Sequence, residues 1–127
     1  MAACLAYYPS INVPRPASGD HPLFNDDSTD GDYESARPVT YASASAPPTV
    51  LFHGTADVTI PLESSVGYFN LLRALDVPVE LHCIDGVPHA FDRHADLGTA
   101  AAVAADLFID RHVINPRTYP PFQSGER

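Results

Sequence analysis

Apolar and polar positions along the chain form alternating blocks that predict strands and helices in turn. Short apolar runs at residues 3–9, 49–53 and 79–84 have the length and the β-branched and aromatic content of strands in a core. A proline ends the first run at Pro9, and a pair of prolines at 47–48 precedes the second, since proline cannot continue a strand ladder. We therefore expect three strands, each bounded by a turn.

The stretches after the second and third strands carry helical spacing instead. Pro61 opens the first predicted helix, and the segment 76–78 closes it because the residue before a proline avoids helical geometry. A second helix is expected from about Asp96 to His112, where the stretch 100–105 is nearly all alanine and valine. One face of the first helix is apolar, through Val66, Phe69, Leu72 and Leu75.

The order strand, helix, strand, helix predicts an α/β fold with a parallel sheet, because a helix that crosses over the sheet returns the chain in the same direction. Residues 1–113 form this predicted domain, and residues 114–127 form a proline-rich C-terminal arm. Within the domain, the segment 10–48 is rich in Pro, Ser, Asp and Gly, with a concentration of acids at 20–34. We expect 10–48 to be a long acidic, proline-rich loop.

The composition narrows the kinds of partner. The chain has 127 residues, the length of one domain, and a formal net charge of −9 at pH 7. This charge argues against a nucleic-acid partner or an anionic membrane surface, because nothing would neutralise phosphates. No apolar run approaches the ~20 residues of a membrane span, and the first residues do not form a signal peptide. Cys4 and Cys83 lie outside any CxxC pair, which favours reduced thiols and a cytoplasmic protein.

Two turns carry the strongest chemical signal. His53-Gly54-Thr55-Ala56-Asp57 ends the second strand, and Gly86-Val87-Pro88-His89-Ala90-Phe91 follows the third. Because functional sites gather at the carboxyl ends of parallel strands, Asp57 and His89 are expected to lie together. A carboxylate beside an imidazole fixes the ring tautomer and leaves the far nitrogen as a general base. A retained Asp–His hydrogen bond without catalysis is the alternative interpretation.

These turns, with a first strand that ends in Tyr-Pro, resemble the C-terminal part of α/β-hydrolases of the esterase and lipase kind. The resemblance implies that Asp57 is the acid and His89 the base of a catalytic triad. It also implies a truncated α/β-hydrolase core of about three parallel strands flanked by helices. The first strand is interior in the whole fold, and a bare apolar edge favours pairing with another strand. We therefore expect a homodimer that completes the core.

The resemblance also implies a serine nucleophile, which this sequence lacks in the expected setting. No Gly-x-Ser-x-Gly elbow occurs in the chain. Ser10 follows the first strand and is a candidate substitute, whereas Ser64 and Ser65 open a helix without the strained elbow. A serine supplied by a separate polypeptide, as in a split esterase, is a further alternative.

A divalent metal, Zn or Mn, is the expected replacement for the missing serine, and no organic cofactor is expected. Imidazole and carboxylate side chains suit these ions, and they are frequent near the two turns. A metal-bound water would ionise near neutral pH and attack an ester. The predicted ligands are Asp57, His89, Asp92, His94 and His53.

Together, these observations predict a hydrolase of ester-type bonds, carboxylic or phosphate esters, acting on a small substrate. Its water would be activated by His89, with Asp57 orienting the imidazole. The alternative is a non-catalytic remnant that keeps the fold and has lost the chemistry.

Overall fold

Three parallel strands form the centre of the part of the chain that the structure describes. The structure, a computed structural model, describes residues 2–12, 27–123 and 125. The strands lie side by side in the order β1-β2-β3, with every pair parallel. They are β1 (Cys4–Tyr7), β2 (Thr49–Gly54) and β3 (Val79–Ile84). The predicted α/β fold with three parallel strands is therefore confirmed.

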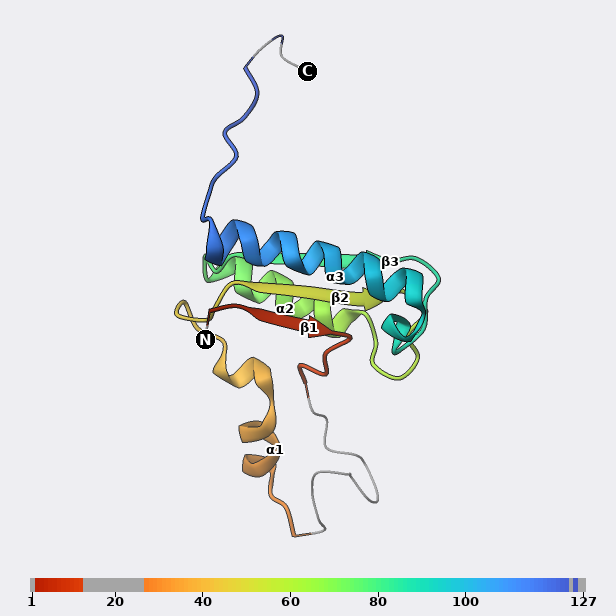
Figure 1. Cartoon of the computed structure of the whole chain (residues 1–127). Helices are drawn as coiled ribbons and strands as arrows, with labels where there is room; N and C mark the ends of the chain where they lie inside the picture. Colours follow the sequence, from red (N-terminus) through yellow and green to blue (C-terminus); the bar gives the residue numbers. More distant parts are fainter. Residues whose placement is uncertain (1, 13–26, 124, 126–127) are drawn as a thin grey trace.

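Two long helices cover the two faces of this sheet. α2 (Glu63–Ala74) connects β2 to β3, and α3 (Ala95–Ile109) follows β3. Figure 1 shows α3 on the near face of the sheet and α2 on the far face. Both predicted helices are present, although α3 passes into a π-helical turn, η3 (Asp110–Ile114), which contains the expected end at His112.

The core lies between β2 and α3. Every residue of β2 is buried, and Val50 and Phe52 pack with Phe108 and two alanines of α3. The alanines Ala101 and Ala105 are small, so α3 lies close to the sheet. Burying each phenylalanine stabilises the fold by about 1.5–3 kcal/mol. This packing fixes β2 firmly and thereby fixes the turn that follows its last residue.

The interpretation of 10–48 as loop throughout was wrong for part of that segment. The structure contains α1 (Asp30–Ala36) and a 3₁₀ turn, η1 (Pro38–Tyr41). A capping box begins α1: Thr29 Oγ1 accepts from the Asp32 N–H at 3.3 Å, and Asp32 Oδ2 accepts from the Thr29 N–H at 2.7 Å. The acids that suggested a solvated loop thus include a helix-starting residue. Residues 13–26 of the predicted loop lie outside the described residues.

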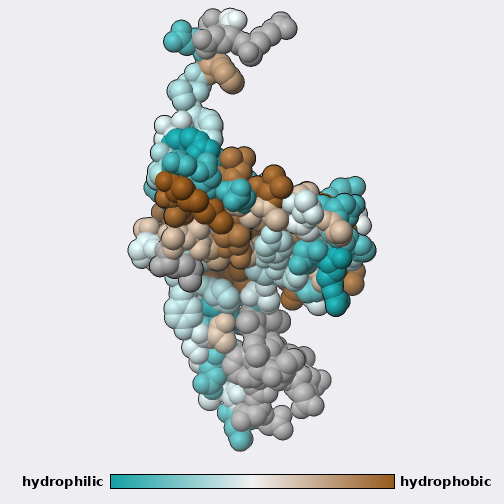
Figure 2. All heavy atoms as spheres, viewed as in Figure 1, coloured by the Kyte–Doolittle hydropathy of each residue, from teal (hydrophilic) through white to brown (hydrophobic). Residues whose placement is uncertain are grey.

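β1 lies at an edge of the sheet, as the sequence predicted for the first strand. Leu5 on this strand is 40% exposed, and Val103 and Leu107 of α3 are also exposed. Figure 2 shows hydrophobic residues gathered over α3 and the sheet beneath it. An exposed edge with apolar side chains favours pairing with another chain. The homodimer stays a prediction, since the structure contains a single chain.

Ile114, the first residue of the predicted C-terminal arm, belongs to η3, whereas the arm's other described residues, 115–123 and 125, extend away from the sheet without a helix or strand (Figure 1). Tyr119 and Phe122 are both exposed on it. Among the described residues, no helix has the length and apolar character needed to cross a membrane.

Candidate active site

The turn that carries Asp57 is tied to the neighbouring strand by backbone hydrogen bonds. The Thr55 N–H donates to the Ile84 carbonyl at 3.0 Å, and the Ala56 N–H donates to the Val87 carbonyl at 3.1 Å. These bonds join the end of β2 to the end of β3 and to the loop beyond it. The two turns singled out in the sequence are therefore held as one unit.

Gly54 allows this close approach. A Cβ atom at this position would lie 2.1 Å from the Val87 carbonyl oxygen, which is far inside contact distance. Any side chain would push the loop after β3 away from the end of β2. The glycine of the His-Gly turn is thus required by the approach of the backbone that leads to His89.

The carboxylate of Asp57 is buried, and both of its oxygens have hydrogen-bond partners. Oδ1 accepts hydrogen bonds from the N–H groups of Thr59 (2.9 Å) and Ile60 (2.8 Å), and Oδ2 lies 2.8 Å from Nδ1 of His89. Burial alone would raise the pKa of Asp57. The hydrogen bonds from Ile60, His89 and Thr59 outweigh that effect and hold the pKa below its ordinary value of 3.8. Asp57 is therefore a carboxylate at neutral pH.

His89 lies at the surface of the same unit, with 31% of its side chain exposed. Because the Asp57 carboxylate accepts, Nδ1 of His89 carries a proton, and in the neutral imidazole the lone pair is on Nε2. Among the described residues, Nε2 has no hydrogen-bond partner. The loop turns through left-handed conformations at Gly86 (φ 69°) and Ala90 (φ 57°), on either side of His89. An oriented imidazole with one free, accessible nitrogen can act as a general base.

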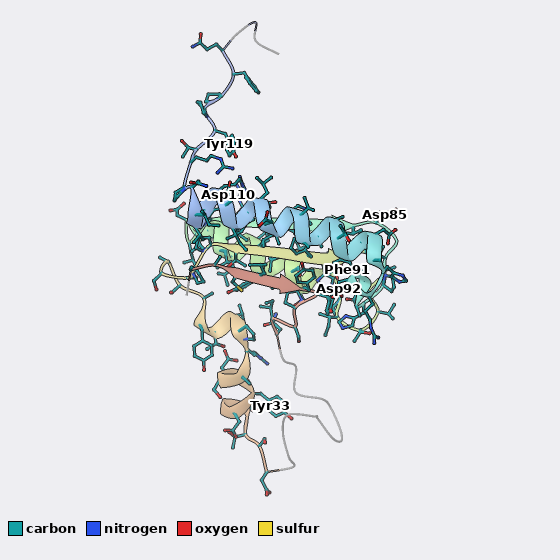
Figure 3. All side chains as sticks on the ribbon, viewed as in Figure 1. Tyr33, Asp85, Phe91, Asp92, Asp110 and Tyr119 are labelled. Atoms are coloured by element: carbon teal, nitrogen blue, oxygen red, sulfur yellow. The ribbon has the colours of Figure 1, made fainter. Side chains whose placement is uncertain are left out.

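Tyr8, at the end of β1, packs against this imidazole, and the sequence analysis missed it. Its ring centroid lies 4.3 Å from that of His89, and its hydroxyl donates to Asp92 Oδ1 at 3.0 Å. That hydrogen bond to a carboxylate is the main cause that raises the pKa of Tyr8. Figure 3 shows Phe91 and Asp92 beside the C-terminal ends of β1 and β2. The signal was the Tyr-Pro end of the first strand, which marked a strand boundary and supported the family resemblance but assigned no role to Tyr8.

His53 lies beneath Asp57 and is completely buried. Its Nε2 lies 2.8 Å from the Ile60 carbonyl oxygen and 3.3 Å from Asp57 Oδ2. Its Nδ1 lies 2.6 Å from the hydroxyl of Ser65, which is also buried. Both ring nitrogens are thus engaged with protein groups.

The five predicted metal ligands do not form a metal site. Asp92 is exposed and bonds Tyr8, while His94 is exposed and begins α3 through its backbone. Only His53, Asp57 and His89 come together, and their facing atoms bond one another or the backbone. Within residues 2–12, 27–123 and 125, no three His, Cys, Asp or Glu side chains form a group that could hold a metal ion. The residues present therefore do not fit the expected metal.

Ser10, the candidate substitute nucleophile, is exposed, and its hydroxyl lies 3.5 Å from the Asn12 carbonyl oxygen. It does not hydrogen-bond His89 in this structure. Ser10 instead lines a cleft of about 360 Å³ beside the Asp57 turn. The other lining residues come from the end of β1, the turn itself and the start of α2; they are Asn12, Thr59, Ile60, Pro61, Glu63 and Ser64.

A family model and a described ester hydrolase both match parts of this chain. The family model described as BD-FAE matches residues 16–72. A Mycobacterium tuberculosis protein described as "Probable carboxylic ester hydrolase LipM" is 34% identical over 80 residues, which is 62% of this chain and 18% of that protein.

Solved structures of an esterase from the planctomycete Thermogutta terrifontis have a similar fold. Its native Est2 structure matches with a TM-score of 0.62 and 26% identity, over 69% of this chain and 33% of the esterase chain. The apo form of esterase 2 from the same organism matches with a TM-score of 0.73 and 22% identity, over 91% of this chain and 44% of the esterase chain. The chain thus spans less than half the length of each of these proteins.

Proposed function

This chain carries the C-terminal part of an α/β-hydrolase core of the esterase type, and on that premise we propose that it takes part in the hydrolysis of carboxylic esters. His89 is the general base and Asp57 orients it. The observation that carries the proposal is the 2.8 Å contact between His89 Nδ1 and Asp57 Oδ2, which leaves Nε2 of this partly exposed side chain to accept a proton.

In the proposed reaction, Nε2 of His89 accepts a proton from an attacking hydroxyl as its oxygen bonds to the ester carbonyl carbon. The Asp57 carboxylate stabilises the imidazolium that forms. When the ester C–O bond breaks, the imidazolium returns the proton to the departing alkoxide. The alcohol is released and the acyl group stays on the attacking oxygen. His89 next accepts a proton from a water molecule that attacks the acyl carbon, and it returns this proton to the first oxygen as the carboxylic acid leaves.

The attacking hydroxyl is proposed to be a serine from a polypeptide segment outside these 127 residues. The sequence contains no Gly-x-Ser-x-Gly elbow, and Ser10 makes its hydrogen bond to Asn12. Without that serine, His89 can still activate water against an ester with a good leaving group. The chain alone is therefore expected to hydrolyse only activated esters, and slowly.

We propose that the substrate is an ester of a short carboxylic acid. The cleft of about 360 Å³ shares Thr59 and Ile60 with the turn that holds Asp57, and we propose that it takes the acid part of the ester, although neither Asp57 nor His89 lines it. One structure of the Thermogutta terrifontis esterase holds propionate. A small acid of that kind is a reasonable size for this cleft.

The test is hydrolysis of p-nitrophenyl propionate by the wild type and by His89→Ala, with His82→Ala as the matched control. His82 lies on β3 and hydrogen-bonds Glu80, so it is also a histidine paired with an acid. We expect His89→Ala to reduce the rate to that of buffer and His82→Ala to leave it unchanged. Equal rates for the wild type and His89→Ala would overturn the proposal.

A further inference from the structure

We infer that His53 is a positioning residue for the Asp57–His89 pair, an inference that rests on the proposed function of that pair. His53 has no exposed surface, so it cannot touch a substrate. It nevertheless contacts the same carboxylate oxygen as His89, with its Nε2 3.3 Å from Asp57 Oδ2. Two histidines, one buried and one accessible, therefore share one oxygen of one acid.

The proton on Nε2 of His53 follows from its surroundings. This nitrogen faces the Ile60 carbonyl oxygen at 2.8 Å and the Asp57 carboxylate oxygen at 3.3 Å, and both oxygens only accept hydrogen bonds. A lone pair on Nε2 would be repelled by both. Nε2 therefore carries the proton and donates it to the Ile60 carbonyl, while the Asp57 carboxylate oxygen lies close to the same N–H.

Ser65 holds the other side of the ring. Its hydroxyl lies 2.6 Å from Nδ1 of His53, and it is completely buried in the first turn of α2. The imidazole thus spans from α2 to the Asp57 turn, with a hydrogen bond at each nitrogen. A ring held at both nitrogens cannot flip without breaking buried hydrogen bonds and leaving buried polar groups unpaired.

The consequence concerns the direction of the Asp57 carboxylate. Its Oδ1 is held by the N–H groups of Thr59 and Ile60, and His53 holds those two residues through the Ile60 carbonyl. Rotation of the carboxylate away from His89 would also separate Oδ2 from His53. His53 therefore restricts Asp57 to the rotamer in which Oδ2 meets Nδ1 of His89.

The experiment compares His53→Gln with His53→Leu. Glutamine can place an N–H donor where Nε2 of the imidazole lies, whereas leucine fills similar space without any donor. His82→Leu is the control, because His82 likewise lies close to an acid, Glu80, but it is on β3 and stacks on Phe52. The readouts are the NMR signal of the His89 Nδ1 proton bonded to Asp57, kcat and KM for p-nitrophenyl propionate, and thermal unfolding.

We expect His53→Leu to lose the His89 Nδ1 proton signal and to lower kcat on the order of 10- to 100-fold with little change in KM. His53→Gln and His82→Leu should keep the signal and the rate. If a folded His53→Leu keeps both, His53 only stabilises the fold and the inference is wrong.

Two other results are possible: His53→Leu does not fold, or His89→Ala remains active. If His53→Leu does not fold, Ser65→Ala takes its place, because it removes one hydroxyl and frees the ring to turn; retention of the Nδ1 proton signal in that variant would overturn the inference. If His89→Ala hydrolyses the ester as fast as the wild type, the proposed function fails. The NMR signal still decides whether His53 positions Asp57, so the two failures are distinguishable.

Discussion

The turn after β2 and the loop after β3 contribute one half each to the candidate site, and they are built differently. In the turn, Asp57 is buried and both of its carboxylate oxygens accept hydrogen bonds. In the loop, His89 is partly exposed and uses one ring nitrogen, on the side of Asp57. The acid is fixed, whereas the base is accessible.

This difference matches what each group must do. A buried carboxylate is costly unless its oxygens are hydrogen-bonded, so the turn surrounds Asp57 with N–H donors. A general base must exchange a proton with a substrate, so His89 has to keep one nitrogen open. A histidine that can act as a general base keeps one ring nitrogen free, whereas His53, with both nitrogens engaged, can only hold other groups in place.

The largest expected effect is the loss of ester hydrolysis when the charged hydrogen bond between Asp57 and His89 is removed. Asp57→Asn keeps the size of the side chain but loses its charge, so His89 loses both its orientation and the stabilisation of its imidazolium. We expect kcat/KM for p-nitrophenyl propionate to fall about 10³-fold. The control is Asp92→Asn, because Asp92 reaches His89 only through Tyr8. A similar loss in both variants would mean that the buried acid has no special role.

The second effect tests the contact that joins the two halves. In Gly54→Ala, the added methyl group meets the Val87 carbonyl at 2.1 Å, so we expect a loss of about 3 kcal/mol in the free energy of unfolding. Gly67→Ala is the control, because nothing lies within 4 Å of that position and the residue is inside α2. It should gain about 0.5–1 kcal/mol, since alanine favours a helix over glycine. Urea unfolding measures both, and equal changes would contradict the packing described here.

The sequence predicted the two turns that carry Asp57 and His89 better than it predicted the side chains around them. The strands, the long helices and the Asp57–His89 pair follow from local patterns, because apolar runs and turn residues determine where parallel strands end. The positions of the five predicted metal ligands in the fold were not predictable, because the number of acids and histidines near a turn does not tell which way their side chains point. Asp92 and His94 are close to His89 in sequence, yet one bonds Tyr8 and the other begins α3.

Two features of the structure were not predicted, for different reasons. α1 starts at a capping box that was hidden within an acidic, proline-rich segment, where composition outweighed the Thr29–Asp32 pattern. The role of Tyr8 depends on β1 lying beside β2, which brings its ring to a loop far along the chain. The first error overlooked a pattern that is present in the local sequence, whereas the second concerns a contact between distant residues that no local pattern reports.

The third effect is on how the free energy of unfolding depends on pH, and it compares buried Asp57 in the turn with the more exposed Asp110 in η3. The folded pKa of Asp57 lies below 3.8, so its contribution to stability is present above that pH and is lost as the pH falls through the lowered folded value. The pKa of Asp110 is also lowered, by hydrogen bonds from Asn115 and Arg117, but at a half-exposed site in η3. We expect Asp57→Asn to flatten acid unfolding between about pH 5 and pH 2 more than Asp110→Asn does. Urea midpoints across that range measure the difference, and a larger effect at Asp110 would contradict it.

The smallest expected effect is that of metal removal. The atoms that would bind a metal at the junction of the two halves already bond each other, since Asp57 Oδ2 meets both His53 and His89 and His53 Nε2 also meets the Ile60 carbonyl. A cation could enter only by breaking these hydrogen bonds. We expect chelator treatment to leave p-nitrophenyl propionate hydrolysis unchanged, and added Zn²⁺ to leave the NMR signals of His53 unshifted. Loss of activity on chelation, restored by Zn²⁺ together with shifted His53 signals, would show that the buried turn opens and that the division into a fixed acid and an accessible base is wrong.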